Sequence, residues 1–124
     1  MKPIIENDNT PQTFPCTDLG NMERFIDQHK DYIRSTSSGA VFEWTGNRWK
    51  PVSYADIFNL ARKTVLKIQS EARHAAAEAE ANDLRRWSLT SQSEAKIRSM
   101  INMACKHEDI QVRLGDFDKN KTQI

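Results

Sequence analysis

Residues 52–114 read VSYADIFNLARKTVLKIQSEARHAAAEAEANDLRRWSLTSQSEAKIRSMINMACKHEDIQVRL and contain neither glycine nor proline. Glycine and proline are the strongest helix breakers, so this long stretch without them, in a polar chain, predicts long helices. Ser53 and Asp56 form an N-terminal capping pattern, and apolar residues follow at helical spacing. We therefore predict a single helix from Ser53 to about Arg86, roughly 50 Å long.

The second half of this predicted helix, Ala72–Ala81, is rich in alanine. Alanine favours the helix but has little surface to bury, so we expect this half to project into solvent or to lie against a partner. Further on, the pattern S-x-x-E from Ser91 to Glu94 predicts the start of a last helix. The residues after that helix, 110–114, are expected to be extended.

A shorter helix and a hairpin are predicted upstream. Thr17 or Asp18 is a good N-cap, and the apolar face expected to follow it comprises Leu19, Met22, Phe25, Ile26 and His29, running on to Tyr32 and Ile33. Alternating residues 40–50 around Gly46-Asn47 predict a β-hairpin, on which residues 110–114 are expected to pack. Trp44 and Trp49 face each other across this hairpin; we assign them to the core first and to base stacking second.

The expected architecture is helix, hairpin, long helix, helix: mainly α with a small β-hairpin, an α+β class. Three prolines and scattered polar residues mark residues 1–15 as a flexible lead or linker. We place the helical domain at residues 16–115 and a polar connector or tail at residues 116–124.

Composition limits the function before any motif is considered. The 124 residues carry 18 Lys and Arg against 17 Asp and Glu, a net charge of +1. This balance excludes a polybasic nucleic-acid condenser and an acidic mimic. We find no apolar run long enough for a membrane span and no secretory signal, and the two cysteines are far apart. These features predict a reduced, intracellular setting.

The sequence offers little catalytic chemistry. Asp116 and Asp118 have the D-x-D spacing that suits metal-dependent phosphoryl transfer, but no third carboxylate or phosphate loop accompanies them, so a solvated turn is favoured. An EF-hand fails because Lys121 occupies its glycine position. The remaining Cys and His residues are too scattered for zinc, and no nucleophile motif is present. We predict no catalytic residue, no metal and no cofactor: the isolated chain is not an enzyme.

Basic residues are the remaining lead. If the long helix and the last helix pack antiparallel, Arg85, Arg86, Lys96 and Arg98 gather at one corner, where they can contact phosphates. The alternative is an ordinary solvated helix face. The candidate DNA-binding residues are Arg62, Lys63, Lys67, Arg85, Arg86, Lys96 and Arg98.

Four stretches together resemble the domain that precedes the superfamily 3 helicase in phage, plasmid and poxvirus primase–helicases. Residues 14–25, FPCTDLGNMERF, resemble the family's T-D-x-G-N-A-x-R-[FL] start, with Met22 in place of Ala. Residues 44–49, WTGNRW, match W-x-G-x-R-W, and residues 87–104 fit W-x-x-x-S-x-S-x-x-[KR]-[IL]-x-x-M-[IL]-x-x-A. Asp116-Phe-Asp118 resembles the family's short acidic connector, which argues against a metal site there.

The resemblance implies a non-catalytic module of DNA replication initiation that couples primase to helicase. The primase and Walker-bearing helicase that flank it in the family are absent from these residues, so it implies an excised or stand-alone middle domain. Expected partners are DNA, single-stranded or forked rather than duplex, and the primase and helicase domains, in a phage- or plasmid-encoded cytoplasmic protein. The alternative is an interaction module without DNA affinity, which docks on a helicase or on itself through Ala72–Ala81.

Overall fold

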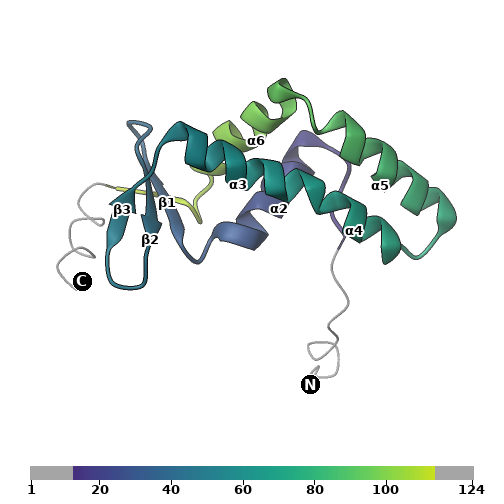
Figure 1. Cartoon of the computed structure of the whole chain (residues 1–124), viewed down its shortest axis with the longest axis horizontal. Helices are drawn as coiled ribbons and strands as arrows, with labels where there is room; N and C mark the ends of the chain where they lie inside the picture. Colours follow the sequence, from purple (N-terminus) through teal and green to yellow (C-terminus); the bar gives the residue numbers. More distant parts are fainter. Residues whose placement is uncertain (1–12, 114–124) are drawn as a thin grey trace, which may run out of the picture.

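The computed structural model describes residues 13–113. The helices in this part of the chain are α2 (Asp18–His29), α3 (Tyr54–Leu66), α4 (Ile68–Arg73), α5 (Glu78–Thr90) and α6 (Glu94–Lys106). The strands are β1 (Ile33–Thr36), β2 (Val41–Trp44), β3 (Trp49–Pro51) and β4 (Gln111–Val112). The sheet lies at one end of an elongated molecule and the α4–α5 pair at the other (Figure 1). The predicted class, mainly α with a small β element, is confirmed.

The sheet has the order β3-β2-β1-β4, with β4 parallel to β1 and the other neighbours antiparallel. Strands β2 and β3 form the predicted hairpin, with Trp44 opposite Trp49 and Gly46 in its turn at a φ of +109°. The prediction that Ile33 continues the first helix is wrong, because α2 ends at His29 and Ile33 is buried in β1. Residues 111–112 are extended as predicted, but they pair with β1 rather than with the hairpin.

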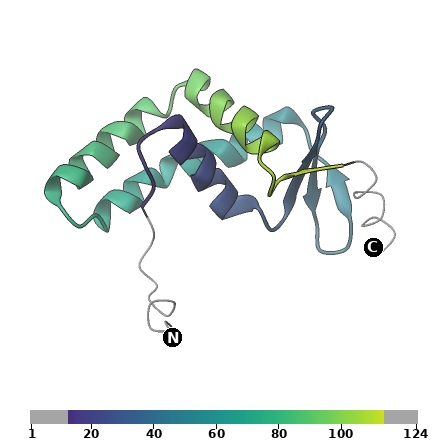
Figure 2. The same cartoon turned by 180° about the vertical axis from the view of Figure 1, so that it is seen from behind.

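The single long helix predicted from Ser53 to Arg86 is wrong. Helices α3 and α4 follow one line, whereas the chain reverses at residues 74–77 and α5 returns beside α4 (Figures 1 and 2). The reversal buries Ala72 and Ala81 and gives Leu84 a place in the core. Alanine propensity favours continuing the helix, but burial of these apolar side chains outweighs it.

A single core joins the helices to the sheet. It contains Phe25 of α2, Ile57 of α3, Leu84 of α5, Met100 of α6 and Ile33 of β1. Leu19, which the sequence places on the apolar face of α2, is instead 59% exposed, so that assignment is wrong. None of the described helices is long and apolar enough to cross a membrane.

The helix starts are set by local side-chain caps. Thr17 caps α2 by accepting a hydrogen bond from the Gly20 amide at 2.9 Å, as predicted. Ser53 and Asp56 form the predicted reciprocal capping box of α3. The predicted start of the last helix is wrong by two residues: Ser93, not Ser91, caps α6 by accepting from the Lys96 amide.

A buried histidine joins α2 to α3. The His29 Nδ1 atom lies 2.5 Å from the Tyr32 hydroxyl, and its Nε2 atom lies 3.1 Å from the Thr64 hydroxyl. The Thr64 hydroxyl in turn donates to Gln28. A neutral imidazole with its proton on Nε2 satisfies both contacts, since it donates to Thr64 and accepts from Tyr32. Burial, followed by the charge of Lys67, lowers the pKa of His29 to about 4.

The lowered pKa of His29 predicts that the free energy of unfolding depends on pH. In the unfolded chain His29 takes up a proton as the pH falls below its ordinary pKa of about 6.5, but in the folded chain it does so only near 4. The stability it contributes is therefore present above about pH 6.5 and is lost between 6.5 and 4, by up to about 3 kcal/mol. Urea unfolding across this range measures the loss. His29→Gln should show a shallower pH dependence; parallel curves for the two proteins would contradict the assignment.

Candidate nucleic-acid interface

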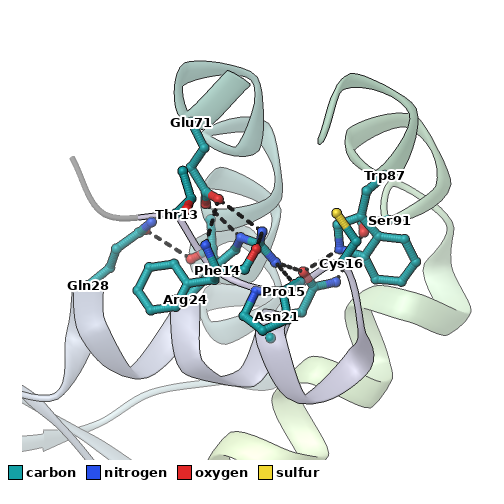
Figure 3. Close-up of polar contacts among 12 residues, drawn as sticks. Thr13, Phe14, Pro15, Cys16, Asn21, Arg24, Gln28, Glu71, Trp87 and Ser91 are labelled. Carbon is teal, nitrogen blue, oxygen red and sulfur yellow. Dashed lines mark hydrogen bonds and ion pairs between the residues drawn. The ribbon is translucent and has the colours of Figure 1, made fainter. Parts of the chain in front are cut away.

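The motif at the start of α2 places a buried guanidinium at the centre of the domain. Arg24 is 1% exposed and lies against Glu71 of α4, with its Nε atom 2.6 Å from one carboxylate oxygen and Nη2 2.9 Å from the other. Its remaining N–H groups donate to the carbonyls of Phe14 and Pro15 and to the Asn21 side chain (Figure 3). All five donors of the guanidinium are thus satisfied.

The same cluster reaches the end of α5. The Asn21 side-chain oxygen accepts from the Trp87 indole at 3.0 Å, and its amide donates to the Ser91 hydroxyl at 3.1 Å (Figure 3). Asn21 and Ser91 are both fully buried. Since α2 carries Asn21 and Arg24 together, one turn of helix holds the N-terminal segment, α4 and the end of α5.

A further contact joins α6 to α2 and α5. The Lys96 ammonium lies 3.0 Å from an Asp18 carboxylate oxygen and 5.2 Å from the centre of the Trp87 ring. Gly20 permits the close passage of the N-terminal segment, because a Cβ atom there would lie 2.0 Å from the Pro15 carbonyl oxygen. We call the set Arg24, Glu71, Asn21, Trp87 and Ser91 the polar hub.

The polar hub explains the sequence resemblance in physical terms. The helix-start pattern of residues 17–24 and the tryptophan–serine pattern of residues 87–96 meet in one set of hydrogen bonds. Sequence reasoning missed Arg24 and Glu71 as partners. The available signal was Arg24 itself, a charged residue set among the apolar residues of α2 next to Phe25.

Four of the seven candidate DNA-binding residues take part in ion pairs. Arg85 pairs with Glu78 at 3.1 Å, Arg86 with Asp83 at 3.2 Å, Arg98 with Glu94 at 2.5 Å and Lys96 with Asp18 at 3.0 Å. The first three pairs are exposed, and their carboxylates would repel a phosphate approaching the same arginines.

The described part of the chain lacks the helix packing on which the predicted corner of basic residues rests. The prediction assumes a long helix packed against the last helix, whereas α5 packs on α4, and α6 packs on α2 and α3. Arg85 lines a cavity between α4 and α5, while Arg86 lines another cavity beside the N-terminal segment and Trp87. Arg98 is exposed on α6.

The remaining three candidates lie near one another at the C-terminal end of α3. Arg62 and Lys63 lie on α3 and Lys67 follows its last residue, and all three are exposed. No acidic side chain of residues 13–113 lies within ion-pair distance of any of them. We call Arg62, Lys63 and Lys67 the α3 basic stripe.

The two hairpin tryptophans lie at the sheet end, away from α5. Their ring centres are 5.3 Å apart, and the Arg34 guanidinium lies 5.6 Å from the centre of the Trp49 ring. Both are half-buried and neither belongs to the helical core, so the assignment of Trp44 and Trp49 to that core is wrong. Their second assignment, to base stacking, stays a prediction.

The described residues hold no cluster of three or more potential metal ligands. Asp116 and Asp118 lie outside the described residues. Burial raises the pKa of the Cys16 and Cys105 thiols, so neither has the thiolate character of a nucleophile.

Comparison with known proteins gives one match. The model of a protein family described as D5 N terminal like matches residues 22–124. No curated protein and no solved structure matches the chain. The matched residues include most of α2, the hairpin and all of α3 to α6.

The polar hub predicts that substituting Arg24 destabilises the fold far more than substituting Arg86. Arg24→Met leaves the Glu71 carboxylate buried without its partner and should lower the free energy of unfolding by about 3–5 kcal/mol. Arg86→Met breaks an exposed pair and should cost less than about 1 kcal/mol. Urea denaturation measures both, and Glu71→Gln, a milder change, should lie between them. Equal effects of the two arginine substitutions would contradict the role given to the hub.

Proposed function

The chain belongs to the D5 N-terminal-like family, the domain that lies N-terminal to the superfamily 3 helicase in primase–helicase proteins, and from this premise we propose that it couples primase to helicase and contacts template DNA. The resemblance inferred from the sequence is thereby confirmed. The domain is an accessory module and not itself catalytic. We further propose that it works inside the cell, in a phage- or plasmid-encoded replication protein.

The observation that carries the DNA contact is the α3 basic stripe. Its three cations are exposed and have no described acidic partner, so they can meet phosphates without first breaking an ion pair. Phosphate contacts of this kind release counterions and give sequence-independent affinity. A domain that holds a helicase near its template needs affinity of this kind, with a preference for single-stranded or forked DNA.

The coupling role rests on how the chain enters and leaves the domain. The described chain enters at residues 13–15, where Arg24 donates to the carbonyls of Phe14 and Pro15, and leaves after β4 at the sheet end. These contacts begin before residue 16, where the sequence analysis places the domain boundary. Both ends are tied to one core, so we propose that the domain transmits the orientation of the segment before it to the segment after it.

The DNA contact predicts a difference between matched charge variants. Arg62→Gln/Lys63→Gln/Lys67→Gln should weaken binding to forked DNA at least about tenfold and reduce the salt dependence of log Kd by about 2. Arg85→Gln/Arg86→Gln/Arg98→Gln removes the same charge from ion-paired positions and should weaken it much less. Fluorescence anisotropy with labelled single-stranded, forked and duplex DNA at several salt concentrations makes the comparison.

Two results would count against this proposal. Equal losses in the two variants would show that only net charge matters, and no binding by the unchanged protein at low salt would exclude a DNA contact in this domain. Trp44→Ala in the same assay tests base stacking, which contributes about 1–3 kcal/mol per stacked base.

The second candidate function is protein docking without DNA affinity. Ala72 and Ala81, at the two ends of the surface expected from the sequence, are buried where α4 and α5 pack together, whereas Ala76, Ala77 and Ala79 between them are exposed. Docking through the exposed alanines stays a prediction. Exposed Leu66 and Leu89 favour docking elsewhere on the helices. Sedimentation at two protein concentrations tests the self-association form of this candidate.

A further inference from the structure

A groove runs along one side of α3 and α4. It consists of a cavity of about 340 Å³ between α3 and the start of α6 and a cavity of about 380 Å³ between α4 and α5. The α3–α4 wall is a single helical face, since its residues recur three or four positions apart: Phe58, Arg62, Leu66, Gln69 and Arg73. Leu66 of the first cavity and Gln69 of the second are three positions apart on this face, so the two cavities lie one after the other along it.

Each wall of this groove carries an exposed leucine. Leu66 on the α3 wall is 45% exposed, and Leu89 on the α5 wall is 67% exposed. Large apolar side chains that stay in water beside a cavity mark a binding surface more often than scattered single ones do. Neither leucine is needed for the core, whose members are buried.

The charge around these leucines is positive. Arg62, Arg73 and Arg85 line the groove; Arg85 is paired with Glu78 at 3.1 Å, and the carboxylate that lines the groove, Glu94, is paired with Arg98 at 2.5 Å. Arg73 has no acidic side chain within ion-pair distance among residues 13–113. An occupant that complements this surface must carry both aliphatic groups and carboxylates.

We propose that this groove binds an acidic, amphipathic segment of a partner polypeptide. Aliphatic side chains of the segment pack on Leu66 and Leu89, and its carboxylates meet Arg62 and Arg73. Nucleic acid fits less well, because phosphates gain nothing from the leucines. A second copy of this chain fits less well too, because a symmetric contact would set arginines against arginines. The inference adds a protein partner to the proposed function and does not depend on the DNA contact.

The experiment selects the partner chemistry directly. A phage-displayed library of random 16-residue peptides is panned on the full chain, with subtraction on Leu66→Ser/Leu89→Ser. We expect enriched peptides that combine Leu, Ile or Phe with several Asp or Glu residues. A synthetic copy of the most enriched peptide should bind at least tenfold more weakly to Leu66→Ser/Leu89→Ser and to Arg73→Glu, and more weakly at high salt.

The controls separate the groove from general surface effects. Leu19→Ser removes a leucine of similar exposure from α2 and should leave peptide affinity unchanged. All of these substitutions are at exposed positions, so thermal unfolding should confirm that the variants are folded. The forked-DNA titration of Leu66→Ser/Leu89→Ser should match that of the unchanged protein, whatever the α3 basic stripe variant does.

Several outcomes would overturn the proposal. Enrichment of basic peptides, or the absence of any peptide that distinguishes the unchanged chain from Leu66→Ser/Leu89→Ser, would reject an acidic polypeptide. Loss of DNA affinity in the leucine variant would assign the groove to nucleic acid. A dimer in sedimentation that the leucine variant abolishes would assign it to a second copy of the chain.

Discussion

The ion pair between Arg24 and Glu71 is the constraint on which the rest of this structure depends. Burying two charges costs several kcal/mol, and the cost is offset only where every donor finds an acceptor. Arg24 meets that condition with the Glu71 carboxylate, two backbone carbonyls of the N-terminal segment and Asn21. Any arrangement that moves α2, α4 or the N-terminal segment apart leaves a buried charge unpaired. The pair therefore specifies how these three parts of a small, polar chain fit together.

The arrangement that this pair fixes also decides which surfaces are left for function. Lys96 is held against Asp18 and Trp87, and Ala72 of α4 and Ala81 of α5 are buried in the core. The α3 basic stripe and the groove beside it, which share Arg62, are among the surfaces that stay exposed. The family places this domain next to a helicase; two adjacent surfaces of different chemistry, one cationic and one apolar with arginines, suit contacts with different partners.

The sequence predicts the features that depend on interactions between residues close in the chain. Thr17 and the Ser53–Asp56 box cap their helices, and the turn at Gly46 pairs Trp44 with Trp49, because each of these interactions spans only a few residues. The sequence does not predict the reversal at residues 74–77, where burial of distant side chains outweighs local helix propensity. Nor does it reveal that Ser91 faces Asn21 rather than capping a helix. Those partners are 70 positions apart, and only the packed structure brings them together.

The central claim, that Arg24 and Glu71 act as one unit, is tested most directly by a double-mutant cycle. The free energies of unfolding of the unchanged protein, Arg24→Met, Glu71→Leu and the double variant are measured in urea at pH 7. If the two residues stabilise the fold as a buried pair, the double variant will be more stable than either single variant, with a coupling energy of at least about 2 kcal/mol. Additive losses, with a double variant that is the least stable of the four, would contradict the account.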